Sequence, residues 1–421
     1  MKIGIIGNGF VGKATKLLSC FEVIVIVYDI RADACEPLGT TLEDINNCDL
    51  VFFCLPTPMN HNGSCYTKIL EDSIKSISNP NKIVRSTVPI QFCKKHNCNF
   101  MPEFLTELNW KEDFINSDFW IIGNDNNDNS FKDKIITLFL LAEQYGVIKS
   151  SRVFLTSTAE AECIKLFKNT YLSNKVSIMN EYYDICIKKN VNYKNVVKFM
   201  GLDKRIGESH MNVPGYNGLR GFGGTCFPKD THSIYSQFQE EGVSAKIFES
   251  VLYRNDTIDR PQREWVSDVW RTTLPRDKPI SIVINGLSDN GLQLCKKLLS
   301  SENVVICLDY PDNFDKLNQD LIKELDFLLT DSNFLIKKTN ITNKFFFPHV
   351  DYIHFLQKIN EKTSYNSLQT NVLEVMNTIE LCKAHNSNFI YYNLYNEVDK
   401  LIDQFGKEYK KYCNIKKSFI E

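Results

Sequence analysis

The chain opens with short apolar runs separated by polar segments, a pattern that indicates buried strands joined by helices and loops. Residues 2–7 read as a strand, roughly residues 10–19 as a helix, and EVIVIVYDI at 22–30 as a second strand. The same theme recurs in DLVFFCLPTP, KIVRSTVP and NFMPEFLTE. These βαβ units predict an α/β domain over residues 1–155, whose loops at the carboxyl ends of the strands are the expected ligand site.

From Ser157 onward the apolar spacing becomes helical. The letters S-T-A-E form a capping box, and apolar residues then recur at helical spacing through residues 164–189, which predicts a helix of about 25 residues or more. A glycine-rich stretch at 215–224 interrupts this pattern, and amphipathic segments resume to about Trp270. We expect a helical second domain over residues 156–275.

A third region begins with the apolar strand ISIVING and continues with a second strand in SENVVICLDY. This pattern again resembles half of a nucleotide-binding βαβ fold. The fold class expected is therefore α/β, with an N-terminal Rossmann domain, a central helical domain with a long helix, and a C-terminal degenerate Rossmann-like domain over residues 279–421.

Composition narrows the range of partners. The 421 residues include 49 basic and 51 acidic side chains, so charge favours neither nucleic acid nor an anionic membrane. No basic, apolar leader and no run of membrane-spanning length occurs, and a cytoplasmic location is expected. The 14 cysteines lack CxxC pairs and the seven histidines lack HExxH, so neither a disulfide framework nor a metal site is expected.

Gly7, Gly9 and Gly12 form GxGxxG between the first strand and the first helix. The three glycines allow a tight turn, close approach of a pyrophosphate, and close packing of helix on strand. Asp29 ends the second strand, where a carboxylate accepts hydrogen bonds from a ribose and repels a 2′-phosphate, which favours NAD. Arg31 weakens that preference. The alternative is a glycine-rich turn without a ligand.

GFGGTCFPKD at residues 221–230 places a cysteine near the start of a helix. Pro228 suits the first turn of a helix, so the helix dipole and the nearby Lys229 would both stabilise a thiolate at Cys226. We interpret Cys226 as an activated nucleophile. The alternative is a buried cysteine that only fills space, which we accept for the other thirteen.

Lys165 and Asn169 stand four residues apart on the long predicted helix and therefore share one face. One cation and one amide could share a site there. Taken alone, a lysine on a helix is usually a solvated surface charge, so this pair gains weight only from the other motifs.

The motifs GNGFVG, CLPTP, STVP, PEFLTE, EAECIKLFKNTYL and GFGGTCFPKD occur in an order that resembles the UDP-glucose/GDP-mannose dehydrogenase family, over residues 1 to about 275. The resemblance implies NAD-dependent, four-electron oxidation of the C6 alcohol of a nucleotide sugar, such as UDP-glucose to UDP-glucuronate. In this chemistry Cys226 would capture the intermediate aldehyde as a thiohemiacetal, which is oxidised to a thioester and hydrolysed.

The resemblance also assigns roles to individual residues. Lys165 and Asn169 would stabilise the developing oxyanion, and Asp230, Thr87 and Glu107 would position water and move protons. Glu103 lies in the same PEFLTE motif and is a further catalytic candidate. The implied cofactor contacts are Gly7, Gly9, Phe10, Val11, Gly12, Asp29, Thr87 and Lys229. The implied substrate contacts are Phe104, Leu105, Lys165, Asn169, Arg205, Gly215, Tyr216 and Gly223, with Arg205 supplied across the interface of a homodimer.

Residues 279–421 lack the C-terminal signature of that family. VVICLDY, TNIT, VDYIHFL and YCNIKKSFIE instead resemble a truncated extended short-chain dehydrogenase/reductase of the UDP-glucuronate decarboxylase type. Gly286, Gly291 and Asp309 are retained, but Ser288 stands where a glycine would admit a pyrophosphate. Tyr412 and Lys416 form a weak YxxxK motif. We expect a Rossmann-like remnant that serves packing or assembly.

The sequence leaves two alternatives open. One is a two-electron dehydrogenase of the 3-hydroxyacid type, which has no need of the Cys226 motif. The other is a noncatalytic scaffold or nucleotide-sugar-binding protein, which suits the altered third region. The number of NADH molecules formed per product distinguishes the four-electron enzyme from both.

Overall fold

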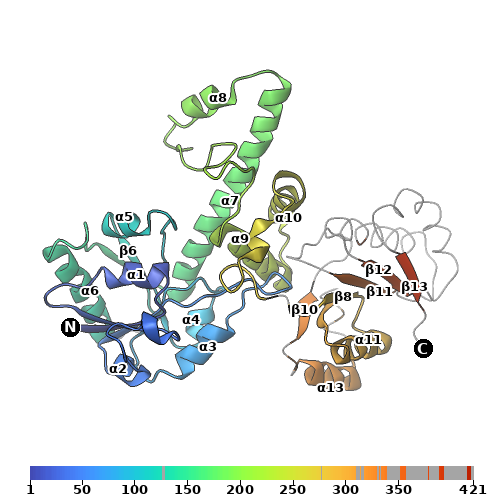
Figure 1. The fold of residues 1–421 in the computed structure, drawn as a ribbon, viewed down its shortest axis with the longest axis horizontal. Coiled ribbons are helices and arrows are strands. Elements are labelled where there is room, and N and C mark those ends of the chain that lie inside the picture. The colour runs from blue at the N-terminus through green and yellow to red at the C-terminus, as the bar shows by residue number, and fades with distance from the viewer. Residues whose placement is uncertain are drawn as a thin grey trace. The chain divides into compact units, whose positions relative to one another are not determined.

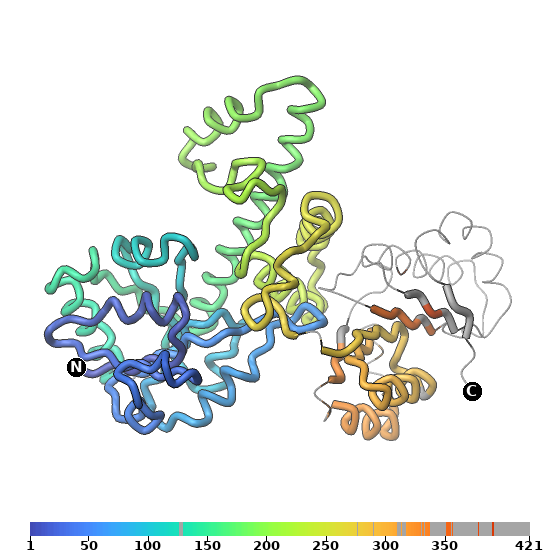
Figure 2. The backbone as a smooth tube through the Cα atoms, in the orientation of Figure 1, coloured from blue at the N-terminus to red at the C-terminus, as the bar shows by residue number. Residues whose placement is uncertain are grey.

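The computed structural model describes most of residues 1–309 and parts of the remainder. The described residues are 1–125, 129–275, 277–309, 313, 317–329, 331, 333–338, 351–356, 378, 388–392 and 415–418. They form two compact units, the first comprising Met1–Pro58 with Cys65–Tyr171 and the second Met59–Ser64 with Leu172–Glu421 (Figure 2). The three-domain division at 1–155, 156–275 and 279–421 stays a prediction.

The first unit is built on a seven-stranded sheet with the order β2-β1-β3-β4-β5-β6-β7 (Figure 1). Neighbouring strands are parallel except β5 and β6. The strands are β1 (Lys2–Ile6), β2 (Ile24–Tyr28), β3 (Leu50–Phe53), β4 (Lys82–Val84), β5 (Asn99–Phe100), β6 (Trp120–Gly123) and β7 (Val153–Thr156). The helices are α1 (Phe10–Lys16), α2 (Leu42–Asn46), α3 (Lys68–Lys75), α4 (Phe92–Lys95), α5 (Trp110–Ile115) and α6 (Asn129–Gln144). This arrangement confirms the expected α/β fold, although α1 ends earlier than residue 19.

Both faces of this sheet are buried. In β3, Leu50 and Phe52 belong to one hydrophobic cluster, whereas Val51 and Phe53 belong to the other. Side chains of a strand alternate between faces, so a continuous apolar run is what a strand covered on both sides requires. The apolar runs of the sequence therefore correspond to the core of the first unit.

Helix α7 (Thr158–Lys188) is the long helix that the sequence predicts, and it continues from the first unit into the second. Its capping box is formed as expected. The backbone N–H of Ser157 donates to Glu160 Oε2 (2.9 Å), and the N–H of Glu160 donates to Ser157 Oγ (3.3 Å). These reciprocal bonds satisfy N–H groups that have no partner within the helix.

The helical part of the second unit follows α7. It contains α8 (Tyr193–Met200), α9 (Cys226–Glu240), α10 (Lys246–Arg254), the π-helical turn η2 (Asn255–Asp259) and the 3₁₀ turn η3 (Glu264–Ser267). None of the helices in the described ranges combines the length and the apolar character that crossing a membrane needs.

The second unit also holds a six-stranded, fully parallel sheet with the order β10-β9-β8-β11-β12-β13. Its strands are β8 (Ile280–Ile284), β9 (Val304–Asp309), β10 (Phe334–Lys338), β11 (Tyr352–Leu356), β12 (Asn388–Tyr392) and β13 (Ile415–Ser418), and its helices include α11 (Asp289–Ser300) and α13 (Gln319–Leu328). In chain order this is 3-2-1-4-5-6, the strand order of a Rossmann fold. The expected Rossmann-like C-terminal region is therefore confirmed.

Candidate active site

The glycine turn after β1 has the geometry that a dinucleotide needs. Gly7 has φ +98°, and a Cβ there would lie 2.5 Å from the carbonyl oxygen of Cys54. A Cβ at Gly12 would collide with the carbonyl of Gly7, which shows how closely α1 packs on the turn. At Gly9, by contrast, a Cβ would meet no atom within 4 Å. The open side of the turn therefore lies at the glycine expected to face the pyrophosphate.

Asp29 lies directly after β2 and organises the same turn. Its carboxylate accepts the N–H of Asn8 (2.8 Å) and the N–H of Arg31 (3.0 Å). The exposed guanidinium of Arg31 lies 3.6 Å from Asp29 Oδ1. A carboxylate has about four acceptor positions, so these bonds leave capacity for a ribose hydroxyl. The residues therefore fit NAD, with Phe10 and Val11 at the start of α1 beside the turn.

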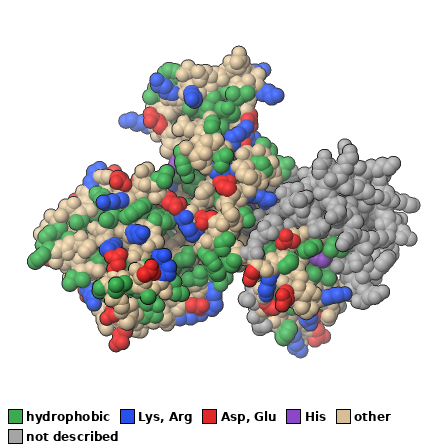
Figure 3. All heavy atoms as spheres, in the orientation of Figure 1, with side chains coloured by type: hydrophobic (Ala, Val, Ile, Leu, Met, Phe, Trp, Pro, Cys, Tyr) green, Lys and Arg blue, Asp and Glu red, His purple; other side chains and the backbone are tan. Residues whose placement is uncertain are grey.

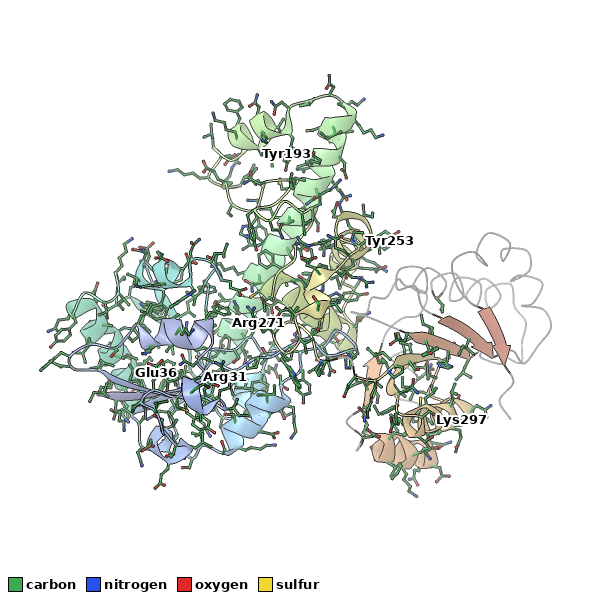
Figure 4. All side chains as sticks on the ribbon, in the orientation of Figure 1. Arg31, Glu36, Tyr193, Tyr253, Arg271 and Lys297 are labelled. Atoms are coloured by element: carbon green, nitrogen blue, oxygen red, sulfur yellow. The ribbon has the colours of Figure 1, made fainter. Side chains whose placement is uncertain are left out.

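Arg31 and Glu36 are labelled in Figure 4, on the segment that follows β2. Glu36 Oε1 accepts a hydrogen bond from the side chain of Asn8 (3.1 Å), and its carboxylate is paired with Lys16. On the face drawn in Figure 3, basic and acidic side chains of the first unit are interspersed.

Glu103 and Lys165 form an ion pair that is almost inaccessible to solvent. Lys165 Nζ lies 2.5 Å from Glu103 Oε1 and 2.8 Å from the main-chain oxygen of Glu103, and the two side chains are 3% and 5% exposed. Burial alone would raise the pKa of Glu103, but Lys165, the N–H of Leu105 and Arg85 together hold it below its ordinary value. Glu103 is therefore an anion that holds the Lys165 ammonium in place.

Asn169 is buried on α7, one helical turn after Lys165, as the four-residue spacing predicts. Thr87 is buried beyond the end of β4. Its main-chain oxygen accepts the hydroxyl of Thr57 (2.7 Å) and the thiol of Cys65 (3.7 Å), which ties the STVP segment to the CLPTP segment. These contacts fix the loops at the carboxyl ends of β3 and β4.

The segment after Glu103 carries Phe104, Leu105 and the exposed Glu107. Phe104 is half-buried, and the ammonium of Lys168 lies 3.8 Å from the centre of its ring. Burial, followed by the charge of Lys165, lowers the pKa of Lys168. Lys168 was not among the residues predicted from the sequence, although its three-residue spacing from Lys165 places the two lysines close together on one helix.

Cys226 is the first residue of α9 and is half-buried. Pro228 lies in the first turn, as expected. Thr225, the preceding residue, has helical torsion angles and does not cap the helix with its own hydroxyl. That hydroxyl contacts Asp268 (3.4 Å) and Arg271 (3.3 Å) instead. The thiol therefore belongs to the N-terminal turn, where the positive end of the helix dipole lies.

Lys229 and Asp230 follow in the same turn of α9 and are both buried. Lys229 Nζ donates to Asp230 Oδ1 at 2.6 Å. Near Cys226, the second unit thus holds a buried cation and a buried carboxylate in direct contact.

The other residues expected at the substrate lie on loops of the second unit. Arg205 is exposed and forms a 2.5 Å ion pair with Asp203. The N–H of Gly215 donates to the carbonyl of Leu219 (2.8 Å), which closes a turn around the exposed Tyr216. Gly223 lies against the side chain of Arg260, close to Cys226 in the chain.

The structure thus brings the expected residues together in two sets. The first unit holds Glu103, Lys165 and Leu105 in direct contact, and the second holds Lys229 and Asp230. Across the described part of the chain, no group of three or more His, Cys, Asp or Glu side chains is arranged to hold a metal ion.

The turn after β8 is closed by its own side chains. Ser288 accepts the N–H of Gly291 (3.2 Å) at the start of α11, and the buried Asp309 accepts the N–H of Leu287 (3.0 Å) and a bond from Asn313. Asn285 donates to the carbonyl of Leu356 (3.0 Å), across the point where the strand order reverses. Tyr412 lies outside the described residues, and Lys416 is described only as backbone of β13.

Comparisons with known proteins show what the chain is similar to. Residues 159–257 match the central domain of the UDP-glucose/GDP-mannose dehydrogenase family. A UDP-glucose 6-dehydrogenase of Rickettsia bellii is 30% identical, over 65% of this chain and 64% of that protein, so the match spans just under two thirds of that relative. A UDP-glucose 6-dehydrogenase of Campylobacter jejuni is also 30% identical, over 56% of this chain and 68% of that protein.

Among solved structures, a UDP-glucose dehydrogenase from Pyrobaculum islandicum aligns with a TM-score of 0.53 at 19% identity, covering 84% of this chain and 89% of that one. At this level of identity the structural alignment supports the fold, and the two sequence relatives and the matched domain support the family. The chain therefore belongs to the UDP-glucose/GDP-mannose dehydrogenase family.

Proposed function

We propose that this protein catalyses the NAD-dependent, four-electron oxidation of the C6 alcohol of a nucleotide sugar, converting UDP-glucose to UDP-glucuronate. The observation that carries this proposal is the position of Cys226 in the first turn of α9, in a chain that belongs to this family. A helix N-terminus favours the thiolate over the thiol, and the thiolate is the nucleophilic form of cysteine.

Cys226 allows two oxidations at one carbon. The first oxidation gives an aldehyde, to which the sulfur of Cys226 adds to form a thiohemiacetal. The second gives a thioester, and water then cleaves the carbon–sulfur bond to release the carboxylate and the free thiol. NAD, when bound, accepts the hydride in each oxidation. In total, the alcohol, two NAD⁺ and one water yield the carboxylate, two NADH and three protons.

Lys165 and Asn169 would stabilise the oxygen of the reacting carbon. The oxygen gains negative charge when the thiolate adds, and a preorganised cation or amide donor lowers the energy of that state. The buried carboxylate of Glu103 supports this role because it favours the charged form of the lysine that it contacts. We propose further that Asp230, Thr87 and Glu107 position water or transfer protons.

The glycine turn after β1 supports the proposal of NAD as the cofactor. Gly9 leaves space for the pyrophosphate, and Asp29 offers acceptors to the ribose. Lys229 is proposed as a further cofactor contact.

For residues 279–421 we propose a role in packing or assembly, which deletion of this region tests. Unchanged activity and assembly of the shortened chain would contradict it.

A homodimer is also proposed, with Arg205 contributed to the substrate of the partner. On α7, Ile178, Tyr182 and Ile185 are exposed and lie four and three residues apart, which places them on one face of the helix. An exposed apolar stripe of this kind suits an interface between protein chains. Light scattering after gel filtration tests this proposal, and a monomer at micromolar concentration would contradict it. Reduced thiols suit a cytoplasmic location.

The decisive experiment is the stoichiometry of the reaction. Purified protein with UDP-glucose and excess NAD should form two NADH per uronate. Cys226→Ser should lose the second oxidation, whereas Cys163→Ser, which changes another half-buried thiol, should keep both. One NADH per stable product would favour the two-electron dehydrogenase. Binding of UDP-glucose without turnover would favour the scaffold.

A further inference from the structure

The segment that leads into Cys226 is held by buried polar side chains. We call residues 220–224 the glycine loop, and we call Asn180, Asn255, Asp259 and Arg260 the loop cradle. All of these residues belong to the second unit. The members of the cradle come from α7, from η2 and from the residue that follows η2.

Two amides of the cradle bind backbone N–H groups of the loop. Asn255 is fully buried, and its Oδ1 accepts the N–H of Phe222 at 2.8 Å. Asn180 Oδ1 accepts the N–H of Gly221 at 3.3 Å. Gly221 has φ +65°, and a Cβ there would lie 2.5 Å from Asn255 Oδ1. The loop can therefore approach these amides only where it has no side chain.

Arg260 contacts the carbonyl side of the loop. Its guanidinium donates to the carbonyls of Arg220 and Gly221, each at 3.3 Å, and its Nε donates to Glu264 at 2.7 Å. Only 2% of the Arg260 side chain is exposed. A Cβ at Gly223 would lie 2.5 Å from Arg260 Cζ, so the guanidinium occupies the space that any larger residue at position 223 would need.

Ion pairs fix the remaining member of the cradle. Asp259 is paired with Arg220 (2.7 Å) and Arg254 (2.8 Å), and both arginines also contact Asp184 on α7 (2.8 and 2.6 Å). The wide turn of η2 buries Asn255, Asp256 and Asp259 together. Short π-helical turns often occur at functional sites, because they redirect side chains that a regular helix would space differently.

We propose that Arg260 is a positioning residue for Cys226, acting through the glycine loop that ends two residues before this cysteine. This inference rests on the proposed function for its kinetic consequence only. A planar guanidinium with several donors can bind two carbonyls and a carboxylate at once, whereas a lysine ammonium cannot reproduce this fork. Without these hydrogen bonds the glycine loop should move, and the thiol of Cys226 should move with it.

The test compares Arg260→Lys with wild type in the full chain. The first readout is the rate at which iodoacetamide alkylates Cys226 across a range of pH, followed by mass spectrometry of the peptide that contains it. Cys163 serves as an internal reference. We expect the rate or its pH midpoint to change for Cys226 and not for Cys163. This readout needs neither substrate nor cofactor.

The second readout is kinetic. A displacement of about 1 Å in a reacting group can slow a reaction roughly a hundredfold, so kcat should fall about tenfold to a hundredfold. The KM for NAD should change less than kcat, because the glycine turn, which supplies most of the proposed cofactor contacts, belongs to the first unit. Arg152→Lys, at an exposed arginine of that unit, is the matched control and should alter neither readout.

The outcomes are distinguishable from failure of the proposed function. Altered alkylation in Arg260→Lys supports positioning even if wild type oxidises no sugar nucleotide. Unchanged alkylation and unchanged kcat in a folded variant would overturn the inference. If Arg260→Lys does not fold, Glu264→Gln replaces it, because Glu264 is exposed and contacts the same guanidinium. A smaller change of the same kind in Glu264→Gln supports positioning, and no change overturns it.

Discussion

Replacing Glu103 by glutamine should destabilise the first unit strongly, because it leaves the Lys165 ammonium buried without a counter-ion. The two side chains are 5% and 3% exposed, so water cannot replace the lost carboxylate. Removing one partner of a buried ion pair costs about 3–5 kcal/mol. Glutamine still accepts a hydrogen bond from Leu105, and the main-chain oxygen of residue 103 still contacts Lys165. We therefore expect Glu103→Gln to lower the free energy of unfolding by about 3 kcal/mol, near the lower limit of that range.

The double variant Glu103→Gln with Lys165→Met separates the charge effect from other losses. Methionine removes the unpaired ammonium, so the double variant should be more stable than Glu103→Gln alone by about 2 kcal/mol. Hydrogen exchange of peptides from α7 and from the segment around β5 measures the local opening free energy. Global unfolding is unsuitable here, because a chain with two units need not unfold in one step.

The pH dependence of this stability difference provides a control on the ion pair between Glu103 and Lys165. The pKa of Glu103 in the folded protein lies below its ordinary value of 4.5. Its stabilising contribution is therefore complete above that value and is lost as pH falls through the lower, folded-state pKa. The difference between wild type and Glu103→Gln should be full at pH 7 and should shrink below about pH 4.5. A double variant less stable than Glu103→Gln, or a difference that grows in acid, would refute this reasoning.

Further predictions concern the two glycine turns. Gly9→Val should weaken NAD binding at least tenfold in calorimetry with little change in thermal stability, because a Cβ at Gly9 meets no protein atom. Gly12→Ala should instead lower the thermal stability, since its Cβ collides with the carbonyl of Gly7. An equal loss of thermal stability in Gly9→Val and Gly12→Ala would contradict this expectation. Calorimetry should also give one NAD per chain, because the hydroxyl of Ser288 occupies an N–H of the second turn. Two NAD per chain would show that this turn opens.

The features that the sequence predicted well depend on residues that are close together in the chain. The burial of β3 on both faces follows from a continuous apolar run, and α7 follows from its capping box and apolar spacing. Cys226 was expected just before a helix and lies in its first turn, because glycines followed by a proline mark such a start. Local chemistry therefore sufficed for the strands, the long helix and the position of the thiol.

The contacts that organise the candidate site join residues far apart in the chain, and the sequence did not predict them. Glu103 was predicted to be a catalytic residue of the PEFLTE motif, but no local pattern indicated that its carboxylate would hold Lys165, which is 62 positions away. Arg260 was not among the predicted site residues, because arginines are mostly exposed and no local motif marks this one. Only the packing shows that its guanidinium occupies the space beside Gly223.

The two glycine turns of this chain show how much depends on one side chain within a motif. Both turns place a glycine against the strand, and both use an aspartate at the end of the next strand to accept an N–H from the turn, at 2.8 Å for Asp29 and 3.0 Å for Asp309. The first turn leaves open space at Gly9, whereas in the second the hydroxyl of Ser288 binds an N–H at the start of the helix. Such N–H groups are what a phosphate would bind. The hydroxyl of Ser288 thus occupies a donor that a phosphate would need, which supports the proposal that the second Rossmann fold serves packing or assembly.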